Sequence, residues 1–340
     1  MIEQIWFNKS WLYILLIPLS FLYELIIFLK KISYKIKLLR SWKSPIPVII
    51  VGNITIGGNG KTPVVIWLVE SLKKEGYKVG VISRGYKGKT KKYPLIVDSN
   101  TTTQTAGDEP ILIFQRTKVP IAVAPKRKKA IQTLLNKFIL DVIITDDGLQ
   151  HYALQRDYEI IVIDGQRRFG NGFLLPAGPM RERKNRLTKV NALIINGGNS
   201  IEKEIEMSLE GNFCINLLTK KICKITDFNS VVAIAGIGFP YRFFMYLKNK
   251  GLILINTYAF SDHKYYKLQE LISLTKQNEI LFMTEKDAVK CQNFAQNNWW
   301  YVPIYAKLNK QKSKIILKEI KKIILKKNLK NINYWYNISI

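Results

Sequence analysis

Cysteine and histidine are scarce in this chain of 340 residues, and their scarcity excludes several kinds of site. The three cysteines, Cys214, Cys223 and Cys291, are odd in number and form no C-x-x-C pair, which argues against a disulfide framework or a structural zinc site. Such a chain is typical of a reducing compartment. The two histidines, His151 and His263, each lie close to acidic residues in the sequence and are therefore candidates for a functional role.

Acidic residues are also few, because 25 Asp and Glu stand against 53 Lys and Arg and the formal net charge is +28. This balance favours an anionic partner, such as nucleic acid, an acidic membrane surface or a phosphorylated substrate. The alternative is that lysine is simply the default surface residue of a chain rich in Lys, Ile and Asn. A nucleic-acid partner is disfavoured, because the sequence has no recognition helix and no interleaving of aromatic and basic residues.

One long apolar run lies near the N-terminus, where Trp11 to Leu29 read WLYILLIPLSFLYELIIFL. As a helix it is just long enough to cross a hydrocarbon core of about 30 Å. Glu24 and Pro18 oppose comfortable spanning, and no small-residue site for cleavage of a signal peptide follows. The next segment is basic, with Lys30, Lys31, Lys35, Lys37, Arg40 and Lys43. We expect anchoring at the cytoplasmic face of a membrane, by spanning or by lying in the interface, with a buried core helix as the alternative.

From Pro47 onward, short β-branched runs alternate with helical stretches. The runs VIIVGN, KVGVISRG, VPIAVAP, DVIITDD, YEIIVID and NALIING predict strands, and Lys61 to Glu75 predict a helix after the first of them. This alternation implies βαβ units, so we expect an α/β fold of the P-loop NTPase type, with a mostly parallel sheet flanked by helices. Ligands of such sheets bind beyond the carboxyl ends of the strands.

A second cycle, VVAIAGIG, LILINTYAF and EILFMTEKD, predicts a smaller α/β domain. The expected divisions are a membrane-associated helix with its basic flank over 1–43, a P-loop core over 44–222, the smaller domain over 223–306 and a basic helix over 307–340. In that last helix Ile316, Ile320 and Ile323 recur at helical spacing. This spacing favours packing back on the core, with added membrane contact as the alternative.

The stretch VGNITIGGNGKTPVV contains the core of a phosphate-binding loop. Its glycines allow successive backbone N–H groups to point at phosphates ahead of a helix N-terminus, while the lysine reaches the terminal phosphates and the hydroxyl holds Mg²⁺. The general pattern requires a glycine where this chain has Thr55. The residues that supply the loop are Gly57, Gly58, Asn59, Gly60, Lys61 and Thr62.

Two acidic positions strengthen the prediction of a nucleotide site. The run VIITDDGLQH ends in Asp146 and Asp147, as a strand that carries a Mg²⁺-holding carboxylate does, although an Asp-Asp-Gly turn is the alternative. In TAGDEP, Asp108 stands before a helix, where it either caps the helix or accepts a proton from an attacking hydroxyl. His263, in FSDHKYY, is a plausible partner for Asp108 across a cleft, but sequence separation does not show that the two meet.

The motifs appear together in a fixed order over residues 51–290: VGNITIGGNGKTP, VISRGYKGK, GDEP, TDDGLQH, VIDGQRRFGNGFLLPAGPMRE, AGIGFPYRFF, DHKYY and TEKDAVK. The ordered set closely resembles the tetraacyldisaccharide 4′-kinase family, the lipid A kinases of Gram-negative bacteria. That family runs G-G-x-G-K-T in its phosphate loop, so Thr55 is no departure from it.

The resemblance implies an enzyme that uses ATP and Mg²⁺ to phosphorylate the 4′-hydroxyl of an acylated glucosamine disaccharide 1-phosphate, which gives lipid IVA. The enzyme would sit at the bacterial inner membrane with its catalytic domains facing the cytoplasm and with no obligate protein partner evident. The resemblance further implies Asp108 as general base assisted by His263, Lys61 as a catalytic residue of the phosphate loop, and Thr62, Asp146 and Asp147 at the metal. Arg84, Gln150, His151 and Asn171 are the residues expected at the acceptor's headgroup.

A membrane-recruited P-loop ATPase that uses hydrolysis to change partners is the rival interpretation. It predicts release of phosphate without a lipid acceptor and assigns no role to His263. Acyl-chain preference, spanning against interfacial placement of the first helix, and oligomeric state are left open by the sequence.

Overall fold

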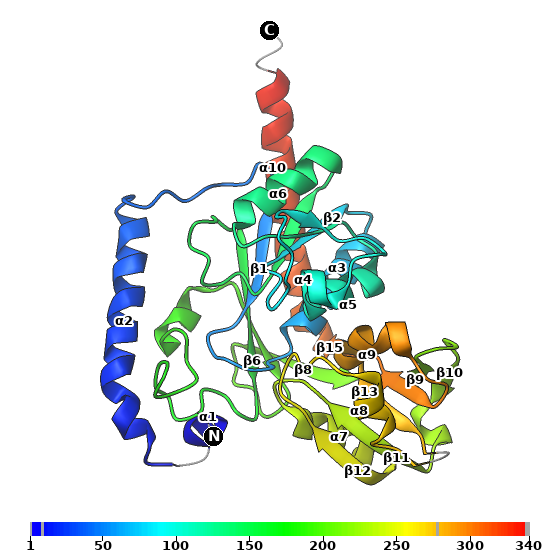
Figure 1. The fold of residues 1–340 in the computed structure, drawn as a ribbon. Helices are drawn as coiled ribbons and strands as arrows, with labels where there is room; N and C mark the ends of the chain where they lie inside the picture. The colour runs from blue at the N-terminus through cyan, green and yellow to red at the C-terminus, as the bar shows by residue number, and fades with distance from the viewer. Residues whose placement is uncertain (1, 8–9, 277–278, 337–340) are drawn as a thin grey trace.

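The computed structural model describes residues 2–7, 10–276 and 279–336, which form two α/β units with an N-terminal helix alongside (Figure 1). The first unit is a nine-stranded sheet in which seven neighbouring strands, from β8 to β4, run parallel, while β15 and β3 are antiparallel at the two edges. Its order is β15 (Tyr305–Leu308), β8 (Glu204–Glu210), β7 (Ala192–Asn196), β6 (Tyr158–Asp164), β1 (Val48–Gly52), β5 (Val142–Asp146), β2 (Val79–Ser83), β4 (Ile121–Val123) and β3 (Leu95–Ile96). The prediction of a mostly parallel α/β sheet is confirmed.

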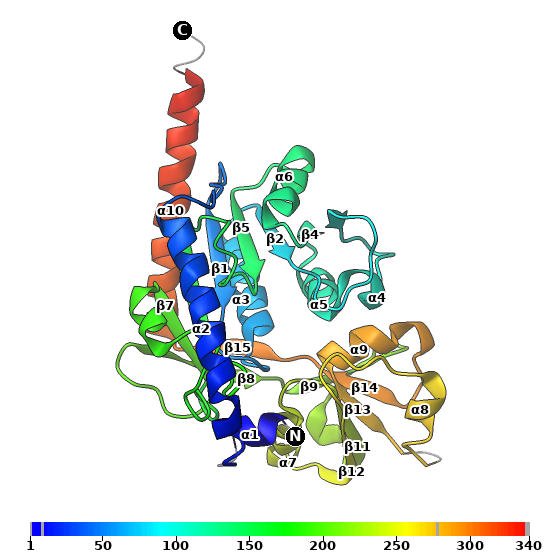
Figure 2. The same cartoon turned by 60° about the vertical axis from the view of Figure 1, so that its left-hand side comes forward.

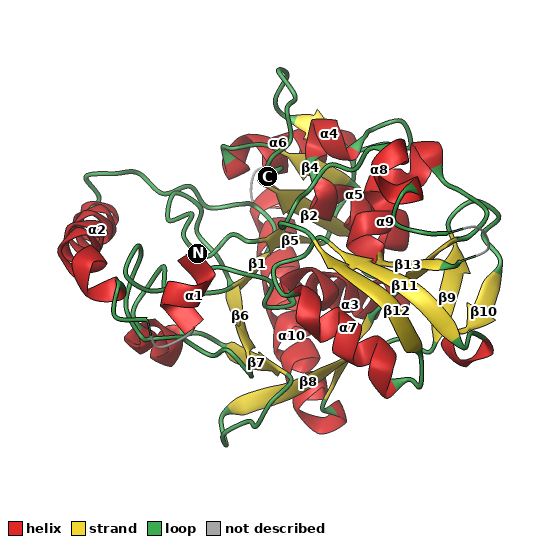
Figure 3. Ribbon diagram, turned by 60° about the horizontal axis from the view of Figure 1, so that its bottom comes forward, coloured by secondary structure: helices red, strands yellow, loops and turns green. Residues whose placement is uncertain are grey.

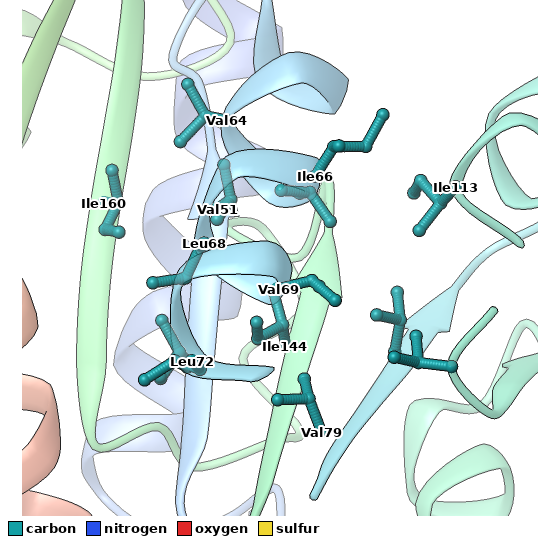
Figure 4. Close-up of a cluster of buried hydrophobic side chains, with 14 of the residues drawn as sticks. Val51, Val64, Ile66, Leu68, Val69, Leu72, Val79, Ile113, Ile144 and Ile160 are labelled. Carbon is teal, nitrogen blue, oxygen red and sulfur yellow. The ribbon is translucent and has the colours of Figure 1, made fainter. Parts of the chain in front are cut away.

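Helices cover both faces of this sheet, and some of them form the crossovers between its parallel strands. Helices α3 (Lys61–Lys74), α5 (Asp108–Thr117) and α10 (Lys310–Tyr336) pack on one face, and α6 (Arg127–Lys137) packs on the other. Figure 4 shows the first face, where Leu68 and Leu72 of α3 lie against Val51 and Ile144 of the central strands. Alternate strand residues point to opposite faces, so strands buried on both sides read as continuous apolar runs.

The C-terminal helix α10 packs on the first sheet over part of its length. Ile316, Ile320 and Ile324 are buried in the same cluster as the central strands, and Lys327 Nζ pairs with Asp157 Oδ2 at 2.9 Å. Beyond this contact the helix projects past the body of the protein (Figures 1 and 2). The first half of α10 therefore packs back on the core as expected, and the second half does not.

The second unit is a six-stranded sheet flanked by short helices. Its order is β10 (Ile222–Lys224), β9 (Phe213–Asn216), β14 (Trp299–Val302), β13 (Leu281–Thr284), β11 (Ser230–Ala235) and β12 (Ile253–Ala259). The helices are α7 (Pro240–Asn249) on one face, and α8 (Leu268–Ile272) and α9 (Glu285–Cys291) on the other. The remaining short elements are α1 (Ile2–Phe7), α4 (Thr103–Ala106) and the 3₁₀ turns Lys184–Lys189, Ile225–Asp227 and Gln292–Phe294.

The strands divide the chain differently from the expected boundaries. The expected division between residues 222 and 223 falls inside β10, because the antiparallel pair β9–β10 already belongs to the second sheet. At the other end, β15 returns to the first sheet and pairs with β8. The chain therefore passes between the two sheets twice, at 211–212 and at 303–304. Short polar strands of this kind carry too little periodicity to be assigned to a sheet from sequence.

The N-terminal helix α2 (Tyr13–Lys35) begins two residues later and ends six residues later than the apolar run at Trp11 to Leu29. It lies to one side of the first sheet, and the long loops of residues 165–190 fill the space between them (Figures 1 and 3). Within the described part of the chain it is the one helix long and apolar enough to cross a membrane, and only 6% of its apolar window is buried. Helix α2 is therefore not a buried core helix, which was the alternative.

Candidate active site

The phosphate loop follows β1 and leads directly into α3, as a P-loop requires. Gly57 has φ of 109° and Gly60 has φ of 91°, values that only glycine adopts freely. Crowding adds to this requirement, because a Cβ on Gly60 would lie 2.6 Å from Asn196 Nδ2. Thr55 also has a place in the loop, since its hydroxyl oxygen accepts a hydrogen bond of 2.8 Å from Asn59 Nδ2. Thr55 therefore stabilises the loop through this hydrogen bond, and a glycine is not needed at its position.

A loop of the second unit touches the phosphate loop. A Cβ on Gly238 would lie 2.4 Å from the backbone nitrogen of Gly58, so the two backbones approach at a distance that a side chain would prevent. Arg242 in α7 reinforces this contact, because its NH2 atom lies 2.7 Å from Asp164 Oδ1 at the end of β6. The phosphate loop is therefore bounded on one side by the second unit.

The two carboxylates after β5 have different environments. Asp146 is buried, and burial, with repulsion from Glu109, raises its pKa to about 7. Burial also opposes ionisation of Asp147, but the positive charges of Lys61 and Arg181 lower its pKa to about 2. Lys61 Nζ lies 3.7 Å from Asp147 Oδ1, and Arg181 NH1 lies 3.1 Å from Asp147 Oδ2. The lysine that would meet phosphates is thus held beside the carboxylates.

These residues fit a Mg²⁺ ion of the P-loop type. Asp146 Oδ1 is buried and has no hydrogen-bond partner among the described residues, and Asp146 lines the same cleft as Thr62. No group of three or more His, Cys, Asp or Glu residues in the described part of the chain is arranged to hold a metal. Mg²⁺ needs no such group, because it usually takes one or two protein ligands and completes its shell with waters and substrate phosphates.

Asp108 and His263 meet across the boundary between the two units. Asp108 opens α5 of the first unit, His263 follows β12 of the second, and His263 Nδ1 lies 3.0 Å from Asp108 Oδ2. His263 has φ of 63°, the left-handed conformation that turns its ring toward the first unit. Asp108 is only 2% exposed, whereas Glu109 and His263 line the cleft directly. The structure therefore contains the contact between Asp108 and His263 that sequence separation alone could not show.

Three of the four residues expected at the acceptor's headgroup line the cleft, namely Arg84, Gln150 and His151. Gln150 Nε2 donates a hydrogen bond of 3.0 Å to Glu182 Oε1. Burial, together with the positive charges of Arg127, Arg156, Lys30 and Arg84, lowers the pKa of His151 to about 4.

Asn171, the fourth residue expected at the headgroup, is not among the residues that line the cleft. Its side-chain amide donates a hydrogen bond of 2.8 Å to the carbonyl of Ala177, and its oxygen accepts one of 3.2 Å from the backbone of Phe173. Both contacts stabilise the loop on which α2 docks, so Asn171 shapes that loop and does not line the cleft. Its place at the headgroup was implied by the family resemblance alone.

The cleft has a volume of about 1110 Å³ and runs from the phosphate loop to α2. Sequence reasoning missed several residues that line it. Among them are Arg127, Arg181, Lys286, Tyr23 and Lys30. Arg127 lies in the basic stretch APKRKKA, where neighbours of the same charge hide the one arginine that is buried. Arg181 lies in a stretch rich in arginine, which the sequence shows. Its contact with Asp147 could not be predicted from that stretch.

Comparisons with known proteins agree with this geometry. A family model described as tetraacyldisaccharide-1-P 4′-kinase, LpxK, matches residues 12–321. The tetraacyldisaccharide 4′-kinase of Hamiltonella defensa subsp. Acyrthosiphon pisum (strain 5AT) is 58% identical over 306 residues, which are 90% of this chain and 93% of that protein. A crystal structure of "apo" form LpxK from Aquifex aeolicus in complex with ATP has a TM-score of 0.75 at 30% identity, covering 92% of this chain and 99% of that one.

Proposed function

Because this chain belongs to the tetraacyldisaccharide-1-P 4′-kinase family, we propose that the phosphate loop and the Asp108–His263 pair carry out that family's reaction in the cleft between the two units. The enzyme transfers the γ-phosphate of ATP to the 4′-hydroxyl of tetraacyldisaccharide 1-phosphate, a step of lipid A biosynthesis that gives lipid IVA. The observation that carries the assignment of residues is the 3.0 Å contact of His263 with Asp108 in a cleft that also contains the phosphate loop.

The loop from Gly57 to Thr62 binds the phosphates of ATP in this proposal. The backbone N–H groups at the start of α3 point toward a bound anion, and Lys61 neutralises charge on the phosphoryl group as it transfers. Thr62 and Asp146 would hold Mg²⁺, with Asp147 beside them to keep Lys61 in place. When bound, the ion neutralises phosphate charge and orients the γ-phosphate for in-line transfer.

Asp108 acts as the general base. Only Oδ2 of Asp108 takes part in a side-chain hydrogen bond among the described residues, which leaves Oδ1 to accept the proton of the 4′-hydroxyl. The hydroxyl oxygen then bonds to the γ-phosphorus as the bond to the β,γ-bridging oxygen breaks. His263 orients the carboxylate from the opposite unit, so the base is complete only when the two units are in contact.

The headgroup of the acceptor binds along Arg84, Gln150 and His151. The cations that lower the pKa of His151 make this part of the cleft strongly positive, which suits an acceptor that carries a 1-phosphate. With its pKa at about 4, His151 is neutral at pH 7 and can hydrogen-bond a sugar hydroxyl without repelling the neighbouring cations.

The rival ATPase function differs from this proposal in the fate of the γ-phosphate. Purified enzyme is incubated with γ-³²P-labelled ATP, Mg²⁺ and tetraacyldisaccharide 1-phosphate in mixed micelles, and the label is divided between lipid and inorganic phosphate. We expect nearly all of the label in the lipid, and little turnover when the lipid is omitted. Label that appears mainly as inorganic phosphate, at a rate independent of lipid, would favour the ATPase.

The N-terminal helix α2 attaches the enzyme to the cytoplasmic face of the inner membrane by lying in the interface. Its polar face is docked on the first unit along much of its length, which argues against spanning. Ser20 Oγ donates a hydrogen bond of 2.9 Å to the carbonyl of Leu174, Glu24 pairs with Arg183, and Lys31 Nζ lies 2.6 Å from Glu182 Oε2. A helix that crossed the bilayer would have to break these contacts, because otherwise the catalytic unit would be drawn into the hydrocarbon.

The opposite face of α2 is apolar and exposed. Its large exposed side chains are Ile14, Leu15, Leu19, Phe21, Leu22, Leu25, Ile26, Phe28 and Leu29. This face, with the lysines that follow it, has the composition of an interfacial helix on an anionic membrane. The acyl chains of the acceptor would then stay in the bilayer while its sugars enter the cleft, whose lining includes Tyr23 and Lys30 of the same helix.

We expect the double variant Leu15→Ser, Phe21→Ser to bind vesicles containing phosphatidylglycerol at least about a hundredfold more weakly than wild type. Two large side chains removed from an apolar contact remove about 3 kcal/mol or more. Both are exposed, at 67% and 64%, so folding is preserved. Sedimentation with vesicles measures the change, and Ile315→Ser, a change at another exposed residue, 57% exposed, on α10, serves as the control. Vesicle affinity that is the same in wild type and double variant would contradict the interfacial placement.

A further inference from the structure

Lys286 is a buried cation at the point where the two units meet. It belongs to α9 of the second unit, and its side chain is 18% exposed. Its Nζ lies 2.7 Å from Glu109 Oε1 in the first unit and 3.0 Å from Asp262 Oδ1 in the second. The same nitrogen is 3.5 Å from His263 Nε2. One ammonium group therefore contacts both the imidazole of the catalytic pair and two carboxylates around it.

The contacts at the two ring nitrogens of His263 together indicate which of them carries the proton. An ammonium group has donors and no acceptor, so Nε2 can take part in the contact with Lys286 only through its lone pair. The proton of the neutral ring must then be on Nδ1, which faces Asp108 Oδ2 at 3.0 Å. The opposite tautomer would place the lone pair of Nδ1 against the carboxylate of Asp108 and an N–H beside the ammonium group of Lys286.

Carboxylates surround both nitrogens of the His263 ring. Glu109 Oε1 and Asp262 Oδ2 each lie 3.6 Å from Nε2, and Asp108 faces the other nitrogen. Lys286 pairs with both of the carboxylates near Nε2 and so offsets their negative charge. The titratable and charged groups that face this cluster from the elements around it are Asp108 and Glu109 of α5, Asp262 and Tyr265 of the loop after β12, Lys286 of α9, and Tyr86 and Lys87 of the loop after β2.

We propose that Lys286 is a positioning residue of the transfer reaction, which holds His263 as the neutral Nδ1–H tautomer directed at Asp108 when the two units are in contact. The inference rests on the proposed role of Asp108 as base. In this state Nδ1–H donates to Asp108 Oδ2 and the carboxylate keeps its charge, so Oδ1 can accept the proton of the 4′-hydroxyl. An imidazolium paired with Asp108 would stabilise the carboxylate and make it a weaker base. Nε2 is directed at Lys286, which leaves Asp108 and not His263 as the proton acceptor.

The presence of only two histidines makes the tautomer directly measurable. Full-length enzyme labelled with ¹⁵N in its histidine rings gives two sets of ring nitrogens, and a His151→Gln variant assigns them. At pH 7.5 we expect wild-type His263 to have a protonated Nδ1 and an unprotonated Nε2. In Lys286→Met both nitrogens become protonated at the same pH, and in Lys286→Arg the wild-type pattern returns.

Kinetics with the lipid acceptor supply the second readout. We expect Lys286→Met to lower kcat about ten- to a hundredfold with little change in the KM for ATP, and to shift the acid limb of the kcat–pH profile to higher pH. Raising the pH then restores part of the lost activity, because deprotonation of the imidazolium returns the tautomer that Lys286 normally selects. A Lys286 that instead bound the phosphates of ATP would raise the KM for ATP and leave the acid limb in place, and that result would overturn the proposal.

Lys290→Met is the matched control, because Lys290 is another buried cation of α9 and pairs with Asp287 away from His263. It reports what loss of a buried ammonium does to the fold, and it should leave the ring nitrogens of His263 as in wild type. The proposal is wrong if Lys286→Met keeps the neutral Nδ1–H tautomer and the wild-type pH profile. Should Asp108→Asn prove fully active, the assignment of the base fails, whereas the nitrogen spectra still report whether Lys286 selects the tautomer.

Discussion

Replacing Asp108 with asparagine should lower kcat for lipid phosphorylation by about 10²–10⁴-fold, the range expected when a general base is removed. An amide is nearly isosteric with a carboxylate and still accepts a hydrogen bond from His263 Nδ1, so the 3.0 Å contact can persist. It cannot accept the proton of the 4′-hydroxyl. The binding of ATP should hardly change, because the side chain of Asp108 hydrogen-bonds to His263 and, among the described residues, to none of the phosphate loop.

The measurement combines steady-state transfer of label to the lipid with the dissociation constant for ATP obtained by equilibrium binding. Asp98→Asn is the control, because Asp98 lies in an exposed turn and its side chain accepts hydrogen bonds only from Asn100 and Thr101 of that turn among the described residues. Its kcat should match that of wild type. If Asp108→Asn phosphorylated the lipid at a rate close to wild type, Asp108 would not be the base.

Replacing Lys61 with methionine should lower kcat by about 10²–10³-fold, because one preorganised cation is lost at the phosphoryl group where charge is redistributed. Methionine keeps most of the length and apolar stem of the side chain. The same change removes the partner of Asp147 at 3.7 Å, although Arg181 remains to pair with that carboxylate. Affinity for ATP should fall as well, since the ground-state phosphates also meet this ammonium group.

Lys74→Met tests whether the effect is local, since Lys74 lies at the exposed end of the same helix α3. Its activity and its melting temperature should both equal those of wild type. A Lys61→Met enzyme that kept wild-type kcat at saturating ATP would show that the loop lysine serves binding alone, and the proposed charge neutralisation during transfer would be withdrawn.

Local motifs predicted the parts of this site that lie close together in the sequence. The phosphate loop could be recognised because glycines, a lysine and a hydroxyl must stand at fixed spacing between a strand and a helix, and α3 begins at Lys61 as that spacing requires. Asp146 and Asp147 could be recognised because they end an apolar run, which the structure contains as β5. Such features depend on backbone geometry over a few residues, which the sequence determines directly.

Contacts between distant segments could not be predicted in the same way. Asp108 and His263 are 155 residues apart, and contacts between the two units, among them the packing of α5 against α9, bring the two residues together. Lys286 lies in the TEKDAVK motif, but neighbours in sequence do not reveal that it bridges Glu109 and Asp262. The antiparallel return of β15 to the first sheet was missed for the same reason, because its partner β8 lies almost a hundred residues earlier.

Asn171 shows how a residue carried over from a family resemblance can have a structural role. It lies among glycines, and its amide is engaged by the backbone of its own loop. Glycines that permit a tight turn for structural reasons cannot be told from glycines that make room for a ligand without the contacts themselves.

A double-mutant cycle on kcat tests the central claim most directly, namely that Asp108 and His263 act as one unit from opposite sides of the cleft. The cycle compares wild type, Asp108→Asn, His263→Ala and the double variant under saturating ATP and lipid. If His263 acts only through Asp108, its loss has no further effect once the carboxylate is gone, and the double variant should be about as active as Asp108→Asn alone. Losses that multiply, so that the double variant is slower by the product of the two single effects, would contradict the account.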